Sequence, residues 1–276
     1  MKDISSKNIS LLRQNSIRVH NLTKKFDKFV AVNCVSLDIK HGEIFAFLGP
    51  NGAGKTTTIK MLTTLLVPTS GSVLLNGKDI AGDPTCARSQ FGIVFQDQSL
   101  DDELTARENL ELHAVLYAVP KAARKERIRV LLQLVELWDR QHDVVKRFSG
   151  GMKRRLEIAR ALLHEPAILF LDEPTVGLDP QTRNHLWEYI SNINKKKGIT
   201  VFFTTHYMEE AEKTADNVAI IDAGKIIAIG SPNEIKKSTK TSSLEQAFLQ
   251  ITGHGMRDDE ASSTDSMRLH ARLWRR

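Results

Sequence analysis

The 276-residue sequence has only two cysteines, Cys34 and Cys86. Their number and spacing give neither a disulfide framework nor a zinc site, and they fit a reducing compartment. No apolar run approaches the roughly 18 residues that span a membrane, and residues 1–18 are too polar for a secretory signal. We therefore expect a cytoplasmic protein that meets a membrane only through a partner or a surface segment.

The composition has no strong excess of one charge. Hydrophobic residues make up 41% and charged residues 26%, which is typical of a globular protein. The length allows a large core, in one α/β domain or in two closely joined lobes. The net charge of +6 would suit nucleotides, nucleic acids or an acidic membrane, but solubility explains it equally well. Charge alone therefore selects no partner.

The ends of the chain differ in pattern from its middle. Residues 1–16 are polar without a clear period, and we expect a loosely ordered arm there. The folded domain is expected over residues 17–251, and it begins with alternating strands at residues 17–22 and 35–39, as in half-buried antiparallel sheets. Residues 252–276 are rich in Gly, Asp, Ser and Arg, which predicts a disordered tail.

One stretch matches the phosphate-binding loop G-x-x-x-x-G-K-[ST]: Gly49, Pro50, Asn51, Gly52, Ala53, Gly54, Lys55, Thr56 and Thr57. Glycines let a strand turn into a helix while backbone N–H groups face a polyphosphate. Lys55 can reach the β- and γ-phosphates, and Thr56 can place its hydroxyl on Mg²⁺. The alternative is a chance match in a glycine-rich turn. The apolar strand at residues 43–48 and the helix at residues 57–66 favour the phosphate loop.

Three further apolar stretches predict buried core strands, at residues 91–96, 167–171 and 199–204. Gln96 ends the first, Asp172 and Glu173 follow the second, and His206 lies just beyond the third. Ligands of open α/β sheets bind outside the carboxyl ends of the strands, so we expect these side chains to converge near the phosphate loop. The alternatives are a pair of acids that only cap a loop, and a structural histidine.

Residues 97–163 have a helical pattern. Thr105 and Glu108 form a capping box before the first helix, and a second helix starts at Lys121. A third helix follows Ser149, with its apolar residues, Met152 included, in the core and its basic run on the solvent side: Lys153, Arg154 and Arg155. The later predicted elements are a helix over residues 180–194, a hairpin at 218–221 and 225–229, a helix capped by Ser231, and a helix over 243–251.

Taken in order, these motifs resemble the ATP-binding cassette of ABC transporters. The resemblance covers residues 17–251, and three stretches are similar to the daunorubicin-resistance-type ABC-2 exporter subunits: residues 92–101, 147–163 and 243–249. It implies an α/β P-loop NTPase with a mixed core sheet, an antiparallel β subdomain and an inserted α-helical subdomain at about residues 97–163.

The resemblance also implies roles for the side chains at the strand ends. Asp172 would hold Mg²⁺ through water, and Glu173 would act as general base on the attacking water. Gln96 would sense Mg²⁺ and that water, and His206 would contact the γ-phosphate. Phe26 stands where the family has its adenine-stacking aromatic; the alternative is an exposed phenylalanine near Phe29.

The family's signature loop is represented by Ser149, Gly150 and Gly151, which would bind the γ-phosphate held by a second copy. The loop departs from the usual Leu-Ser-Gly-Gly-Gln at Phe148 and Met152, so a polar contribution from the last position is lost. Asp179 matches the D-loop, which crosses the dimer interface in the family.

The expected function is that of an ATPase subunit that forms a homodimer around two Mg-ATP and powers a separate integral-membrane permease. The subunit would lie on the inner face of the cell membrane, and export of a drug, antibiotic or lipid-like molecule is expected by resemblance. The alternative is a soluble ABC ATPase acting on ribosomes or DNA. Such relatives carry two cassettes or a long inserted coiled coil, and neither is present here, so no nucleic acid partner is expected.

Overall fold

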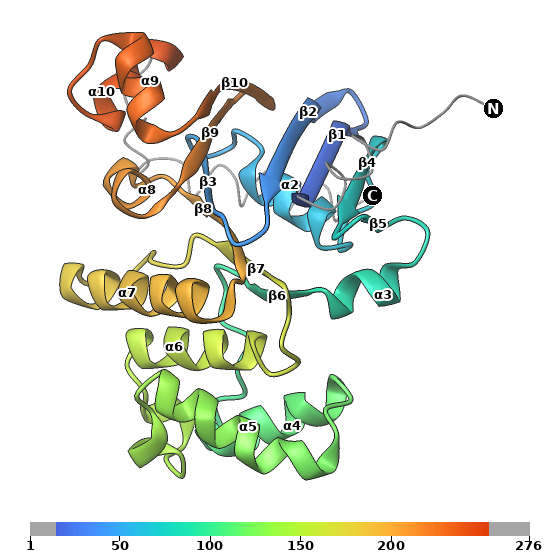
Figure 1. Cartoon of the computed structure of the whole chain (residues 1–276), viewed down its shortest axis with the longest axis vertical. Helices are drawn as coiled ribbons and strands as arrows, with labels where there is room; N and C mark the ends of the chain where they lie inside the picture. Colours follow the sequence, from blue (N-terminus) through green and yellow to red (C-terminus); the bar gives the residue numbers. More distant parts are fainter. Residues whose placement is uncertain (1–14, 254–276) are drawn as a thin grey trace.

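The computed structural model describes residues 15–253 (Figure 1). The expected arm and tail lie outside these residues, except that residues 15 and 16 begin strand β1, Thr252 ends the last helix, α10, and Gly253 follows it as the C-cap. Between residues 15 and 253, no helix has the length and apolar character needed to cross a membrane.

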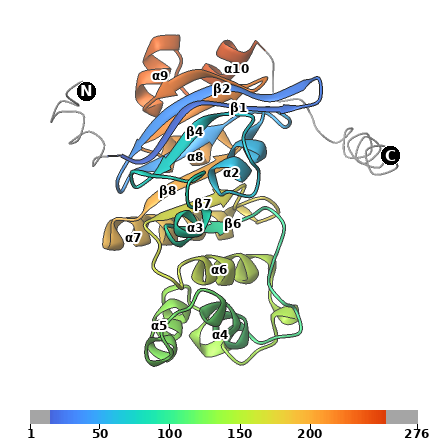
Figure 2. The ribbon, with the colours of Figure 1, turned by 90° about the vertical axis from the view of Figure 1, so that its right-hand side faces the viewer.

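A six-stranded mixed sheet forms the centre of the domain (Figures 1 and 2). Its strands in spatial order are β10 (Lys225–Gly230), β9 (Asn217–Asp222), β3 (Ile44–Leu48), β8 (Thr200–Thr205), β7 (Ile168–Asp172) and β6 (Phe91–Val94). All neighbours pair in parallel except β9 and β10, which form an antiparallel hairpin. β3, β7 and β8 are buried along their whole length, as parallel strands covered on both faces are.

A second, antiparallel sheet covers one face of the first (Figure 2). Its strands in spatial order are β2 (Phe29–Lys40), β1 (Asn15–Phe26), β4 (Ser70–Leu75) and β5 (Lys78–Asp79). Helix α2 (Lys55–Leu62) shares an apolar core with both sheets, in which Ile59 and Met61 join Ile17, Phe45 and Phe47. The phosphate loop is thus anchored between two sheets.

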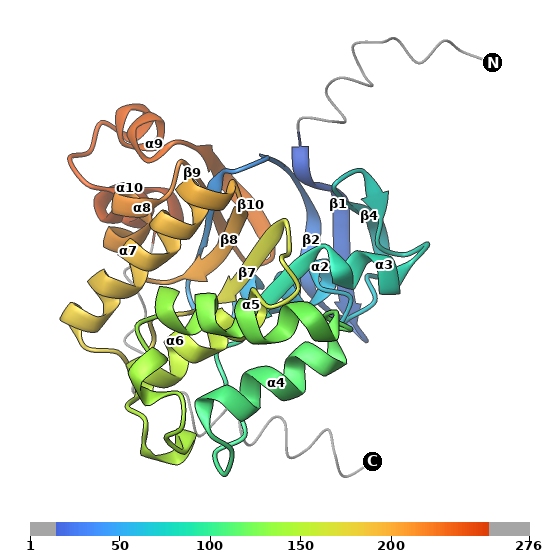
Figure 3. The same cartoon turned by 60° about the horizontal axis from the view of Figure 1, so that its bottom comes forward.

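Helices gather on the opposite side of the mixed sheet, where α4, α5 and α6 form a separate group (Figure 3). The helices on this side are α4 (Ala106–Leu116), α5 (Lys121–Leu134), α6 (Gly150–Ala161), α7 (Pro180–Lys197), α8 (Met208–Thr214), α9 (Pro232–Thr239) and α10 (Leu244–Thr252), with 3₁₀ turns at Trp138–Arg140 and Val145–Arg147. A second apolar core joins α4, α5, α6 and α7 to this face of the sheet. Helix α3 (Pro84–Ser89) belongs to the other face, where Ala87 joins the core around α2. The expected division into a mixed sheet, an antiparallel sheet and a helical insertion is confirmed.

Most predicted elements are present with shifted ends. The capping boxes at Thr105 and Ser231 and the β9–β10 hairpin are confirmed. The helix after the phosphate loop ends at Leu62, and not at residue 66. β6 ends at Val94, so Gln96 lies in the loop beyond the strand. The short elements β5, α3 and α8 were not predicted, because runs of two to seven residues leave no readable period.

One prediction for α6 was wrong. Arg154, expected on the solvent side, is only 6% exposed. It faces inward because Glu157, three residues further on, is fully buried and forms an ion pair with it at 2.9 Å. A helix can bury an arginine when a partner on the same face offsets its charge. Met152 agrees with its prediction and packs, partly buried, against the helical core.

Gly92 determines how closely α6 approaches the sheet. A Cβ atom at Gly92 would lie 2.2 Å from the backbone oxygen of Ala161, the last residue of α6. We predict that Gly92→Ala lowers the free energy of unfolding by about 1–3 kcal/mol, the usual cost of overpacking a core. Gly82→Ala is the matched control, since its nearest neighbour atom lies 3.9 Å away. Urea unfolding measures both, and equal midpoints would contradict the prediction.

Candidate functional site

The phosphate loop connects β3 to α2 and is held in a shape that excludes side chains. Gly54 has a φ of +107°, which glycine adopts without strain, and a Cβ there would lie 2.6 Å from the Ala31 oxygen. A Cβ at Gly49 would lie 2.4 Å from the Ile221 oxygen. No side chain caps the start of α2, so its first N–H groups are available to an anion at the positive end of the helix.

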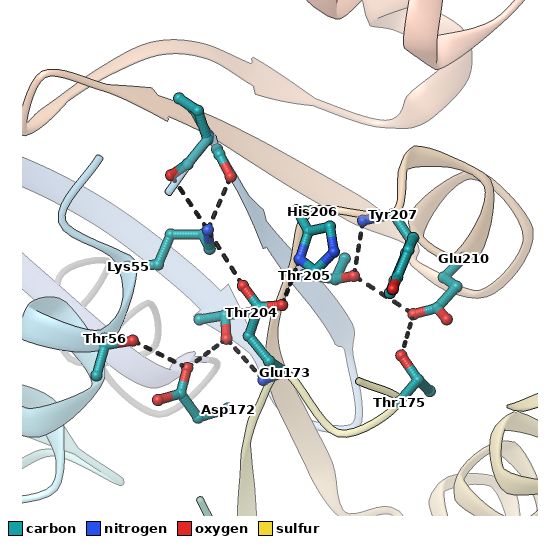
Figure 4. A network of polar contacts seen from close by, with 12 residues as sticks. Lys55, Thr56, Asp172, Glu173, Thr175, Thr204, Thr205, His206, Tyr207 and Glu210 are labelled. Carbon is teal, nitrogen blue, oxygen red and sulfur yellow. Dashed lines mark hydrogen bonds and ion pairs between the residues drawn. The ribbon is translucent and has the colours of Figure 1, made fainter. Parts of the chain in front are cut away.

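Lys55 places a buried ammonium at the centre of this loop (Figure 4). Its Nζ donates to the backbone oxygens of Gly49 at 2.8 Å and Pro50 at 3.2 Å. The same Nζ lies 3.2 Å from Oε1 of Glu173, which follows β7. The loop and the end of β7 are therefore joined by an ion pair between two buried side chains.

Glu173 is held from two sides. Its Oε2 lies 2.5 Å from Nδ1 of His206, which follows β8. Its backbone has a φ of +49°, an uncommon conformation for a glutamate that stores strain at the site. The backbone N–H of Glu173 donates to Oγ1 of Thr204 at 3.0 Å, which fixes that conformation. The Tyr207 ring packs against the His206 ring at a tilt of 41°, with 4.1 Å between the ring centroids, and restrains it.

Asp172 lies beside Glu173 but in a different environment. Its Oδ1 accepts a hydrogen bond from Thr204 at 2.6 Å and lies 3.5 Å from the Thr56 hydroxyl. Burial raises the pKa of the Asp172 carboxyl, and the Thr204 hydrogen bond opposes this only in part. Burial also acts to raise the pKa of Glu173, but the His206 hydrogen bond and the Lys55 charge outweigh it, so that pKa is lowered. Glu173 is therefore a carboxylate at neutral pH.

The Thr56 hydroxyl and the Asp172 carboxylate fit a magnesium ion in their chemistry. Both are hard oxygen ligands, and they come together from α2 and β7. Among residues 15–253, no cluster of three or more His, Cys, Asp or Glu side chains could hold a metal. The pair therefore suits a cation that takes its remaining ligands from phosphate and water, as Mg²⁺ prefers.

Other predicted site residues lie apart from this network. No hydrogen bond or ion pair found in residues 15–253 joins the signature loop or Asp179 to Lys55, Asp172 or Glu173. Ser149 instead caps α6 through the Met152 N–H, and Asp179 caps α7 through the Thr182 N–H. A Cβ on Gly151 would lie 2.5 Å from the Thr182 methyl, so the two caps pack together. They form one surface at the starts of α6 and α7.

Phe26 and Gln96 are also outside the network. The Phe26 ring is 45% exposed, and the Lys24 ammonium lies 5.1 Å from its centroid. Lys24 is anchored to the Val67 oxygen at 2.7 Å, so it covers part of the ring. Gln96 is exposed, and only its backbone oxygen makes a hydrogen bond, to Arg154 at 3.0 Å.

Two buried groups near the site were not identified from the sequence. Thr204 contacts both Asp172 and the Glu173 backbone, and its place at the carboxyl end of a core strand was the available signal. Glu210 accepts from Thr175 at 2.9 Å and from Thr205 at 3.4 Å, and burial raises its pKa (Figure 4). Glu210 belongs to the unpredicted α8, so nothing in the strand pattern indicated it.

The ABC transporter family profile matches residues 32–176. The linearmycin resistance ATP-binding protein LnrL of Bacillus subtilis (strain 168) is 42% identical over 219 residues, covering 79% of this chain and 70% of LnrL. The daunorubicin resistance ATP-binding protein DrrA3 of Streptomyces coeruleorubidus is 38% identical over 228 residues, covering 83% and 72%.

Solved structures agree with these sequence matches. An ATP-binding subunit of an ABC transporter superposes with a TM-score of 0.77 at 32% identity, over 86% of this chain and 99% of that one. The dimeric ATP-binding cassette MJ0796, in a post-hydrolysis state bound to ADP and Pi, superposes with a TM-score of 0.70 at 29% identity, over 78% and 98%. The chain therefore belongs to the ABC transporter family, as one of its ATP-binding, ATP-hydrolysing cassettes.

Proposed function

We propose that Glu173 is the general base of ATP hydrolysis in this cassette. One observation carries the proposal: the buried Glu173 carboxylate bridges Lys55 in the phosphate loop and His206 at the end of β8. A carboxylate with a lowered pKa can accept a proton from a water molecule at neutral pH. His206 holds the carboxylate in place and would contact the terminal phosphate.

The phosphate contacts come from the loop and the start of α2. Lys55 and the backbone N–H groups of the phosphate loop after Pro50 would bind the β- and γ-phosphates. Thr56 and Asp172 would hold Mg²⁺, and the Gln96 side chain would be a further ligand from the loop after β6. A bound Mg²⁺ supplies positive charge that neutralises the phosphate oxygens. Phe26 would stack on the adenine with the part of its ring that Lys24 leaves exposed.

The second half of each ATP site would come from another copy of the chain. Ser149, Gly150 and Gly151 lie at the exposed start of α6, where the helix end and small residues suit an anion. Within residues 15–253, no hydrogen bond or ion pair joins these residues to the buried Lys55–Glu173 pair. A head-to-tail homodimer would bring them to the γ-phosphate, with Asp179 at the interface, and the dimeric MJ0796 cassette supports this arrangement.

We further propose that the dimer powers export through a separate integral-membrane permease at the inner face of the cell membrane. Relatives named for linearmycin and daunorubicin resistance support a drug, antibiotic or lipid-like substrate. The cassette domain would span residues 17–251, with its helical part at residues 97–163 free to contact the permease.

Replacement of the general base is the direct test of hydrolysis. Glu173→Gln should lower kcat for ATP roughly 10²- to 10⁴-fold, the range of general-base catalysis, while nucleotide binding persists. Glu209→Gln is the matched control, because Glu209 is exposed on α8, where its carboxylate pairs with Lys213 at 3.7 Å. Phosphate release measures both variants. A Glu173→Gln protein that hydrolyses ATP at the wild-type rate would show that the base is another group.

Dimer formation can be tested on the same variant. Glu173→Gln with excess Mg-ATP should double in mass in size-exclusion chromatography with light scattering, because bound ATP is not consumed. The double variant Glu173→Gln/Lys55→Ala should stay monomeric, since it lacks the phosphate-binding ammonium. A Glu173→Gln chain that binds ATP and remains a monomer at all concentrations contradicts the shared site.

The proposed membrane partner can be tested by co-purification. Glu173→Gln purified by affinity tag from detergent-solubilised membranes of its own cells should retain an integral-membrane protein, in a fixed ratio to the dimer. Recovery with ribosomes or DNA in place of a membrane protein would favour the alternative, a soluble ABC ATPase.

A further inference from the structure

The loop after β6 carries Gln96 but has little support of its own. Residues 96–99 are exposed. Across residues 15–253, no backbone–backbone hydrogen bond outside the helices and strands involves these residues. A loop held so weakly would not keep Gln96 near the phosphate site, so its position depends on side chains from elsewhere.

Those side chains come from one face of α6, at Arg154, Glu157 and Arg160. Arg154 donates from Nη1 to the Phe95 oxygen at 2.5 Å and from Nη2 to the Gln96 oxygen at 3.0 Å. A planar guanidinium can bind two successive carbonyl oxygens in this way, which a lysine ammonium cannot do with the same geometry. Arg154 therefore fixes the backbone on both sides of the Gln96 Cα.

The other two residues hold the far end of the loop. Glu157 accepts from the Ser99 N–H at 2.9 Å through Oε1 and pairs with Arg154 through Oε2. Arg160 donates to the Ser99 oxygen and to its hydroxyl, both at 2.6 Å. All three charged side chains are at most 7% exposed. Charged groups are buried at a high cost in solvation, so their use on a solvent-exposed loop needs an explanation beyond packing.

We propose that Arg154, braced by Glu157, is a positioning residue for hydrolysis: it fixes the loop that presents Gln96 and ties that loop to the helix bearing the signature loop. The inference rests on the proposed role of Gln96. Ser149 begins α6 and Arg154 lies in its second turn, so a movement of the helix start reaches Gln96 through two hydrogen bonds. Binding of ATP to one copy would in this way adjust Gln96 in the other.

The charges around Arg154 include a carboxylate of the candidate site. Burial lowers the pKa of the Arg154 guanidinium, and the charges of Glu157, then Asp172 and Asp97, oppose this effect. The Asp172 charge thus contributes, after that of Glu157, to keeping Arg154 in its charged form. Its neighbour Arg155 points elsewhere, to the Val135 oxygen and Glu136 of the helical group, and provides a control of equal type.

A double-mutant cycle tests the inference. ATPase rates are measured for the wild type, Arg154→Met, Gln96→Ala and the double variant, with Arg155→Met as control and thermal unfolding recorded for each. We expect Arg154→Met to lower kcat about tenfold with KM for ATP changed less than about twofold. Arg154→Met should have almost no further effect on kcat in the Gln96→Ala background, because Arg154 acts through the Gln96 side chain, which that background lacks. Arg155→Met should leave kcat unchanged.

The results distinguish a positioning role of Arg154 from a purely structural one. If Arg154→Met lowers kcat equally with and without Gln96, or raises only KM, the residue is structural and the inference is wrong, while the proposed base and phosphate contacts stand. If Gln96→Ala leaves kcat unchanged, the proposed role of Gln96 itself is wrong, and the inference falls with it. Should Arg154→Met fail to fold, Arg154→Lys replaces it in the same cycle, since it keeps the charge and loses the paired hydrogen bonds.

Discussion

The site depends on the parallel register of β3, β8 and β7. Leu48 pairs with Thr205, and Thr204 pairs with Asp172, so the three strands end at one edge of the sheet. Each strand is followed at once by a polar segment, and the register brings the phosphate loop, Glu173 and His206 within hydrogen-bond reach. A shift of one residue in any pair would turn these side chains to the other face.

The second determinant of the site is the balance of charge in a buried place. Lys55, Asp172 and Glu173 are all at most 6% exposed, and each would be costly to bury alone. The Lys55–Glu173 pair and the hydrogen bonds of Thr204 offset that cost. Because the groups are already held by one another, the proposed hydrolysis would need little reorganisation as charge develops. The strained backbone of Glu173 belongs to the same arrangement.

The sequence predicted the parts of the site that depend on strand ends and on the glycine loop, because both have strong local patterns. It did not predict the role of Thr204, because any residue of a core strand could have stood at that position. It did not predict the left-handed backbone of Glu173 either, because no local pattern in the sequence indicates it. Arg154 was misplaced because a run of basic residues on a helix normally faces solvent. Its buried partner, Glu157, lies on the same face at a spacing of three residues, and recognition of that pair would have reversed the prediction.

The close approach of Gly92 to Ala161 also sets where the signature loop lies relative to the mixed sheet. The end of α6 rests directly on the backbone of β6, and its last turns are buried, whereas Ser149 and Gly150 at its start are exposed. The absence of a side chain at position 92 therefore fixes the separation of helix and sheet at one end, and with it the place at which the other end of the helix presents the signature loop. A larger residue at position 92 would displace α6 from β6 and would shift Ser149 and Gly150 with it.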